Sequence, residues 1–262
     1  MAPGFIASQA AKALDFPRFL NTFKRLHLNV ITESVTAWLN MERWDECGKE
    51  AIRDLDGRMC WGGLDLASVE DTAAFVLVFP DEEDGTFDIL AKFWLPEETA
   101  RRKTKLPYAQ WAKAGLIELI PGEVIDHDLI GMRVVELAEQ HRIVDIGFDP
   151  YNAHKLVTEL QENHGLQMIA FRQGFLSMSD PCKTLERMVV QKKIRHGNNA
   201  LMRWQASNAT VKTDVITEMV VLSTDAAVRA DFKDLLEQLN SQEVKRFRRG
   251  WFGLPRSTDI GD

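Results

Sequence analysis

Two aspartates lie where a carboxylate could take part in chemistry. Asp65 interrupts the apolar stretch WGGLDLASVEDTAAFVLVF (61–79), and Asp149 ends the stretch IVDIGFD. Burying a carboxylate is costly unless a cation or hydrogen bonds compensate the charge. If the two stretches form neighbouring strands, the carboxylates converge on one point, which requires a shared proton or a metal ion. Because no His or Cys stands beside either acid, the donor set favours Mg²⁺ or Mn²⁺ over zinc.

A purely structural role is the alternative for each aspartate. An Asp at the end of a strand commonly forms a turn or caps a helix. That interpretation is strong for Asp149, because Pro150 follows it, and weaker for Asp65, which leucines flank on both sides. The residue types alone leave both interpretations open.

The elements that must position these aspartates form an α/β pattern. Strands rich in β-branched and aromatic residues are expected at 60–66, 72–80 and 86–96, with a Gly-containing turn at 81–86, which predicts a three-stranded antiparallel meander. Further strands are expected at 143–149, 166–172 and 200–211, and helices at 108–115, 128–142, 152–165 and 182–194. A meander followed by alternating strands and helices predicts an α/β domain with a mixed sheet.

The first 57 residues differ from the rest of the chain. Residues 5–57 show apolar side chains at near-helical spacing, with Pro17 as the expected start of one helix. Similarly, Asn152 is expected to cap the helix over 152–165, with Gly165 just beyond its end. The N-terminal segment is more typical of a connector than of a catalytic core.

Composition limits the classes of function. The chain has 262 residues and a net charge of −7, which argues against coating nucleic acid by bulk electrostatics but permits a local basic groove. Basic clusters stand at 100–105, 191–196 and 245–249, and each also fits an ordinary solvated surface. No apolar run reaches the roughly 20 residues of a membrane span, and the three cysteines show no C-x-x-C spacing. We expect a soluble, intracellular protein with free thiols.

Six blocks of sequence carry a family resemblance. They resemble, in the same order from about residue 26 to residue 214, successive blocks of the nuclease domain of tailed-phage terminase large subunits. The blocks are WGGLDLASVEDTAAFVLVFP, FWLPEE, PYAQWAKAGLIELIPGEVID, IGFDPYNA, FRQGFLSMSDP and RHGNNALMRWQASNATVKTD. The resemblance implies an RNase H-like (retroviral-integrase-like) mixed β-sheet flanked by helices. It also implies a metal-dependent endonuclease that cuts concatemeric phage DNA, with Asp65 and Asp149 as catalytic, metal-binding acids.

The third acid of that family has no clear counterpart here. The family carries it after the last strand, in a block resembling Lys-x-x-x-Lys-Ile-Asp-Gly, and the best substitute in this chain is Asp225 of STDAAV. On a helix beginning near Ser223, Asp225 would share a face with Val228 and Phe232. Asp225 therefore either completes a metal site or stabilises the N-terminus of that helix, which is worth about 0.5–2 kcal/mol.

The resemblance also suggests a domain organisation. Large terminase subunits carry an ATPase motor before the nuclease, and this sequence has no G-x-x-x-x-G-K-[ST] phosphate loop. We therefore expect residues 1–57 to be a helical remnant of the interdomain connector, 58–242 the RNase H-like nuclease domain and 243–262 a basic C-terminal tail. Motor function is expected to be absent from this polypeptide.

The chemistry implied by the resemblance is in-line hydrolysis of double-stranded DNA by two Mg²⁺ or Mn²⁺ ions. Asp65 would bridge the ions, and Asp149 and Asp225 would each complete one coordination sphere. His196 is either a phosphate contact or a structural residue. We expect terminase small subunit and portal protein as further partners and no involvement of a membrane. The expected location is the cytoplasm of the bacterial host. The cations expected to hold the DNA backbone are Lys192, Lys193, Arg195, Arg203 and Lys212.

Two alternative functions stay open. The missing third-acid block and missing motor favour a catalytically impaired terminase module that acts in DNA or portal binding. A junction-resolving nuclease on the same fold would need a dimer interface, which the sequence does not identify.

Overall fold

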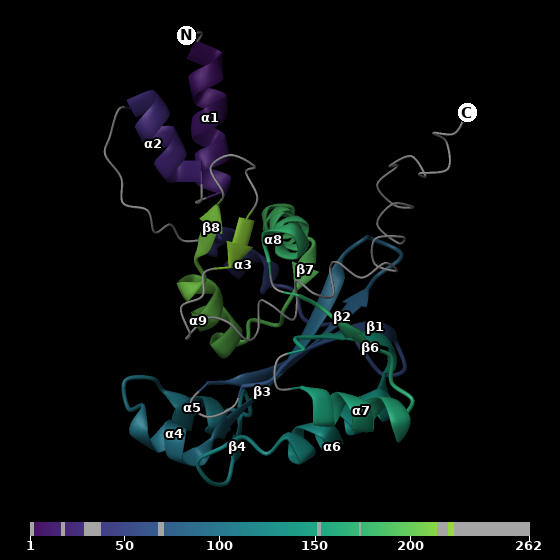
Figure 1. Cartoon of the computed structure of the whole chain (residues 1–262). Coiled ribbons are helices and arrows are strands. Elements are labelled where there is room, and N and C mark those ends of the chain that lie inside the picture. The colour runs from purple at the N-terminus through teal and green to yellow at the C-terminus, as the bar shows by residue number, and fades with distance from the viewer. Residues whose placement is uncertain are drawn as a thin grey trace, which may run out of the picture.

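A seven-stranded mixed sheet forms the centre of the part of the chain that the structure describes (Figure 1). The computed structural model describes residues 3–16, 19–28, 38–67, 71–150, 153–172, 174–213 and 220–222. The strands of this sheet are β1 (Met59–Asp65), β2 (Ala73–Pro80), β3 (Phe87–Pro96), β4 (Glu118–Ile120), β5 (Arg142–Phe148), β6 (Met168–Ala170) and β7 (Ile194–Arg195). Their order is β4-β3-β2-β1-β5-β6, with β7 beside β3, and β8 (Val211–Thr213) and β9 (Val220–Leu222) form a separate pair.

The predicted antiparallel meander is confirmed. β1 pairs with β2 and β2 with β3, both antiparallel, and every residue of β2 except the last is buried. The turn at 81–86 closes through a hydrogen bond from the backbone amide of Asp81 to the carbonyl of Thr86 (2.9 Å). Gly85 takes a φ of +64° there, a conformation that glycine adopts without steric cost.

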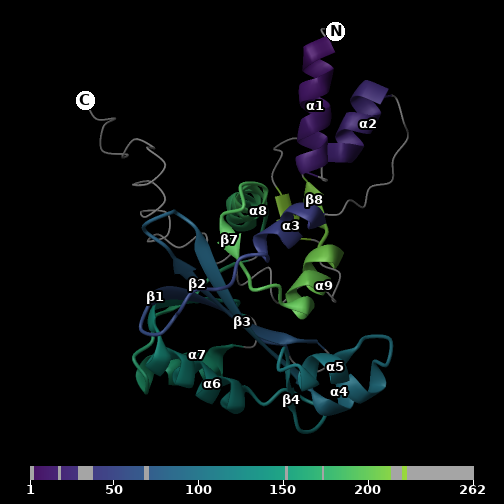
Figure 2. The ribbon, with the colours of Figure 1, turned by 180° about the vertical axis from the view of Figure 1, so that it is seen from behind.

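Helices cover both faces of the sheet, as Figures 1 and 2 show from opposite sides. α6 and α7 lie on one face, and α3, α8 and α9 lie on the other. Each face has its own apolar cluster: Trp61 and Ala74 belong to the cluster on the α8 face, whereas Leu64 and Ile146 belong to the cluster on the α6 face. The helices are α1 (Pro3–Asp15), α2 (Leu20–Leu28), α3 (Met41–Cys47), α4 (Glu97–Arg102), α5 (Tyr108–Lys113), α6 (His127–Gln140), α7 (His154–Glu162), α8 (Phe175–Val190) and α9 (Ala200–Asn208).

Part of the expected connector packs against the sheet. Trp38 and Trp44 are fully buried in the cluster on the α8 face, together with Trp61 of β1. The division of the chain at residue 57 stays a prediction, but residues 38–47 contribute to the same core as the strands. Within the described ranges, no helix is long and apolar enough to cross a membrane.

The predicted strand over 200–211 is wrong, because most of it forms helix α9. The side chain of Asn199 accepts hydrogen bonds from the backbone amides of Leu201 (2.9 Å) and Met202 (3.2 Å), which is an N-cap. Leu201, Met202, Gln205 and Ala206 are buried, a spacing that only a helix turns toward one side. The cap at α7 also differs: Ala153 occupies the N-cap position, and Asn152, like Pro17, lies outside the described residues.

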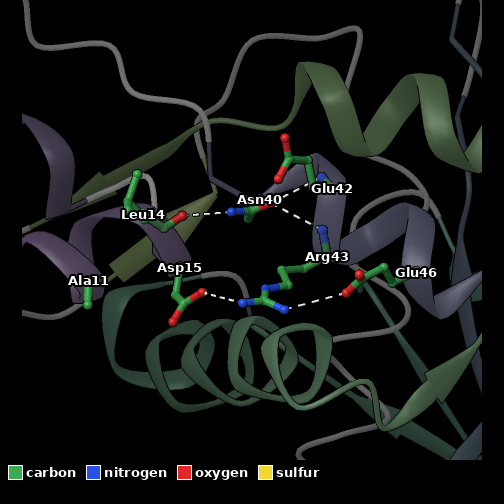
Figure 3. A pocket seen from close by; sticks show the side chains of 7 residues that line it. All are labelled: Ala11, Leu14, Asp15, Asn40, Glu42, Arg43 and Glu46. Carbon is green, nitrogen blue, oxygen red and sulfur yellow. Dashed lines mark hydrogen bonds and ion pairs between the residues drawn. The ribbon is translucent and has the colours of Figure 1, made fainter.

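A cavity of about 470 Å³ lies between α1 and α3 (Figure 3). The amide of Asn40 donates to the carbonyl of Leu14 (2.6 Å), and the Arg43 guanidinium pairs with Asp15 (3.0 Å) and Glu46 (3.5 Å). These contacts tie α1 to α3. Neither candidate catalytic aspartate lines this cavity.

Candidate active site

The sheet brings Asp65 and Asp149 to adjacent positions. β1 and β5 are parallel neighbours in which Leu64 is the partner of Phe148, so the next residue on each strand is one of the two aspartates. Neighbouring strands lie about 4.8 Å apart, and both carboxyl ends meet at the same edge of the sheet. Both aspartates are partly buried. The condition on which the sequence argument depended, that their strands are neighbours, is therefore met.

Both aspartates belong to the face that α8 covers. Leu64 and Phe148 pack in the cluster on the α6 face, and successive side chains of a strand point to opposite faces. Asp65 is paired with Ala74, which lies in the cluster on the α8 face. By the same alternation Asp149 follows Phe148 onto that face. Two carboxylates thus share one edge and one face of the sheet.

This pair fits the donor set that a hard divalent cation prefers. Mg²⁺ and Mn²⁺ bind carboxylate oxygens and keep water in their remaining positions, and two adjacent, partly buried aspartates supply such oxygens. Among the residues that the structure describes, no three His, Cys, Asp or Glu side chains gather as a metal site. Asp225, the predicted third ligand, lies outside the described residues.

The start of α6 contacts the segment that follows Asp65 and is joined to the start of α7. The Nε2 atom of His127 lies 3.3 Å from the carbonyl oxygen of Ala67, two residues after Asp65. Lys155, in the first turn of α7, donates to the Asp128 carboxylate (2.7 Å). The sequence gives only a weak signal for these contacts, which is the Asp that precedes the apolar repeat of α6.

The register separates the predicted basic residues of β7 from the aspartates. Arg195 is paired with Asp88 near the start of β3, whereas Asp65 is aligned through Ala74 with Phe93 near the end of β3. The five residues from Asp88 to Phe93 span about 17 Å along the strand. The segment carrying Lys192, Lys193 and Arg195 therefore lies toward the opposite edge of the sheet.

Arg195 is buried rather than exposed to a DNA backbone. Its side chain is 4% exposed and makes two hydrogen bonds to the fully buried carboxylate of Asp88, from Nε (2.7 Å) and Nη2 (3.2 Å). Arg58 pairs with the same carboxylate (2.8 Å). The guanidinium of Arg195 is thus a structural group of the core, and this corrects the expectation that it contacts DNA.

Three of the other predicted cations, Lys192, Lys193 and Arg203, lie on or near the surface and have partners within the chain. Lys192 pairs with Glu46 (3.0 Å), and the ammonium of Lys193 donates to the carbonyl of Asp84 (2.7 Å). Arg203 makes a bidentate pair with Asp45 (2.7 and 2.8 Å). Lys212 is part of β8. A DNA backbone would have to displace or share the three described partners.

His196 could have been a phosphate contact or a structural residue, and in the fold it is a structural residue. The ring is buried, stacks on Trp44 with centroids 4.2 Å apart, and bonds through Nε2 to the Trp44 carbonyl (2.9 Å). Its Nδ1 atom is buried and has no hydrogen-bond partner. Burial lowers the pKa of His196, although the nearby Asp45 carboxylate acts in the opposite direction.

We expect acid to weaken the fold through His196. The pKa of His196 is lower in the folded than in the unfolded protein. Below about pH 6.5 the unfolded chain therefore binds a proton at this residue more readily than the folded chain does. The free energy of unfolding, measured with urea, should therefore fall from pH 7 to pH 5, and by less in His196→Gln. An equal fall in the two proteins would contradict this role.

Comparison with known proteins identifies the family of this chain. The family model "Terminase large subunit, endonuclease domain" matches residues 4–233. The large terminase subunit of Enterobacteria phage HK97 is 29% identical over 230 residues, covering 86% of this chain and 45% of the relative. Protein YmfN of Escherichia coli (strain K12) is 25% identical over 221 residues, covering 80% of this chain and 48% of the relative. The chain thus spans about half the length of these relatives.

A solved structure supports the same assignment. The crystal structure of the HK97 large terminase matches with a TM-score of 0.67 and 27% identity, covering 90% of this chain and 49% of that one. The mixed sheet and flanking helices confirm the expected RNase H-like fold. Because the family model matches most of this chain, the chain belongs to the family of terminase large subunit endonuclease domains.

Proposed function

We propose that this chain is a metal-dependent endonuclease that hydrolyses phosphodiester bonds of double-stranded phage DNA during genome packaging. The observation that supports this most directly is the adjacency of Asp65 and Asp149 at the carboxyl ends of β1 and β5. Membership of the endonuclease family gives the pair its chemical context. A structural pair of turn-forming aspartates would not need to share one edge and one face of the sheet.

Asp65 and Asp149 would hold Mg²⁺ or Mn²⁺, two ions in our proposal, with Asp225 as the third ligand. When bound, such ions activate a water molecule and stabilise the leaving oxygen of an in-line displacement. The contribution of the chain is to hold two carboxylates on rigid neighbouring strands. Their partial burial would limit competing water around a bound ion.

The partners follow from the packaging role. Double-stranded DNA is the proposed substrate, terminase small subunit and portal protein are the proposed protein partners, and the bacterial cytoplasm is the proposed location. Lys192, Lys193, Arg203 and Lys212 stay predicted DNA contacts. If they bind DNA, the duplex must extend well beyond the aspartates, because the Lys192–Lys193 segment adjoins β7.

Cleavage of a supercoiled plasmid tests the proposal. The 262-residue chain should convert the plasmid to nicked and linear forms with Mg²⁺ or Mn²⁺, and the reaction should stop when EDTA is added. Plasmid that stays supercoiled at all metal concentrations would refute an active nuclease.

A catalytically impaired packaging module is the second candidate. The absence of the family's third-acid block from the sequence favours it. Isothermal calorimetry separates the two functions, because an impaired module should bind DNA yet give no heat with Mg²⁺ or Mn²⁺. A competent site should give saturable heat that Asp65→Asn removes.

A further inference from the structure

The corner between β6 and α8 adjoins the proposed cleavage site. Phe148 is the partner of Ala170, so Phe171 lies beside Asp149, and the Phe171 amide donates to the Phe148 carbonyl (2.9 Å). Arg172 is the next residue. From the strand spacing and rise, its Cα lies about 6 Å from that of Asp149.

Arg172 differs from the basic residues that sequence clustering selects. It is exposed, whereas Arg195 is buried against Asp88. Within the described part of the chain its guanidinium has no ion-pair partner, whereas Lys192 and Arg203 each have one. Phe171 packs in the cluster on the α8 face, so alternation places Arg172 at the same edge of the sheet as the two aspartates but toward the opposite face. Arg172 is therefore an exposed cation at the edge where the two carboxylates lie.

Ser177 in the first turn of α8 is hydrogen-bonded to the backbone of Arg172 and of Gly174. The Ser177 hydroxyl donates to the Arg172 carbonyl and accepts from the Gly174 amide (3.2 Å). Hydrogen bonds that are already present in the free protein reduce the backbone entropy that is lost on binding.

Apolar side chains are exposed at the same corner. Leu176 is 86% exposed and Phe175 is 39% exposed, the former being the most exposed large apolar side chain in the described chain. Ile169 of β6 is 49% exposed and is paired with Gly147, on the face that carries the aspartates. Single exposed apolar residues are common on proteins, but Phe175 and Leu176 follow Arg172 by only three and four residues.

We propose that Arg172, Phe175 and Leu176 form a DNA-contacting corner. This proposal rests on the proposed function. Arg172 binds a backbone phosphate next to the one that is cleaved, and Phe175 and Leu176 pack against sugars in the minor groove. Apolar side chains beside basic ones are a recurrent means of gripping that groove. Since phosphate contacts position a duplex without reading its sequence, the corner sets where the strand lies relative to Asp65 and Asp149.

Binding of a 30-base-pair duplex, followed by fluorescence anisotropy in EDTA, tests the corner without cleavage. Arg172→Gln should weaken binding about tenfold and lower the slope of log affinity against log salt by about one. Arg172→Lys should restore most of the slope. Leu176→Ser should weaken binding about fivefold and leave the slope unchanged, because it removes apolar contact only.

Arg142→Gln is the matched control. Arg142 is an exposed arginine at the first residue of β5, so it lies at the edge of the sheet opposite Asp149. If the wild-type chain does not bind the duplex, or if Arg172→Gln binds like Arg142→Gln, the proposal is overturned. An unchanged affinity in Leu176→Ser would overturn the apolar part and assign that surface to a protein partner.

The plasmid assay keeps the two proposals distinguishable. If the wild-type chain binds DNA and depends on Arg172 but does not cut plasmid with Mg²⁺, the nuclease proposal fails and the corner stands. If the chain cuts plasmid and Arg172→Gln cuts at the same rate at subsaturating DNA, the corner proposal fails and the nuclease stands.

Discussion

Replacing Asp65 with asparagine should abolish the metal-dependent cleavage of plasmid DNA, and Asp149→Asn should do the same. Each change keeps the size of the side chain and removes the negative charge that a divalent cation needs. We expect each rate to fall by at least about a thousandfold, equivalent to about 4 kcal/mol of transition-state stabilisation. The double variant should be no worse than the more damaged single variant, because residues that act as a unit are not additive.

Asp56→Asn is the control for that experiment. Asp56 is an exposed acid in the turn that precedes β1, whereas Asp65 is the last residue of β1. Its activity should match that of the wild-type chain, and circular dichroism should show all variants folded. Equal activity in Asp65→Asn, Asp149→Asn and wild type would end the assignment of the site.

Replacing Asp88 with alanine should cause the largest loss of stability among single changes of charged residues. Its fully buried carboxylate pairs with Arg195 and Arg58, and the backbone amide of Arg53 also donates to it (3.4 Å). Removal of one partner of a buried pair leaves the other charge uncompensated, which typically costs 3–5 kcal/mol, so we expect a decrease of about 4 kcal/mol in the free energy of unfolding. Urea denaturation measures it.

Breaking an exposed pair is the matched comparison. Asp45 and Arg203 make equally short contacts, but their side chains are 41% and 46% exposed. Asp45→Ala should cost no more than about 1 kcal/mol, because water replaces the lost partner. A similar loss in Asp45→Ala and Asp88→Ala would show that burial does not determine the cost.

The pH dependence of the Asp88 effect has a defined sign. Burial raises the pKa of Asp88, but hydrogen bonds from Arg195 and Arg58 outweigh it, so the pKa is below its ordinary value. Its contribution to stability is therefore present above about pH 4, the unfolded pKa, and is lost as the pH falls through the folded pKa. The difference in stability between wild type and Asp88→Ala should narrow as the pH is lowered from 6 to 3.

The meander was predictable because its signals are local. The apolar run of β2 and the polar turn at 81–86 depend on residues close together in the chain, and the structure forms both. Helix α9 was missed because an apolar and aromatic segment of that length fits either period. The N-cap at Asn199 was the signal that could have identified it.

The basic residues show that runs of charge in the sequence do not predict which cations lie near the candidate site. Lys192, Lys193 and Arg195 form one run in the sequence, yet the Arg195 guanidinium is buried against Asp88 and the run lies toward the opposite edge from Asp65. Arg172 stands outside all three basic runs and lies beside Asp149. Charge density along a chain does not specify position in a fold.

The sequence by itself determined the strand pattern, the family and the identity of the two aspartates at strand ends, because these depend on residue type, local period and ordered motifs. Only the tertiary structure decided that β1 and β5 are neighbours, that their register aligns Asp65 with Asp149, and which cations remain available beside them. The physical reason is that strand pairing joins residues more than 80 positions apart, and no local preference encodes which strands will pair or in what register.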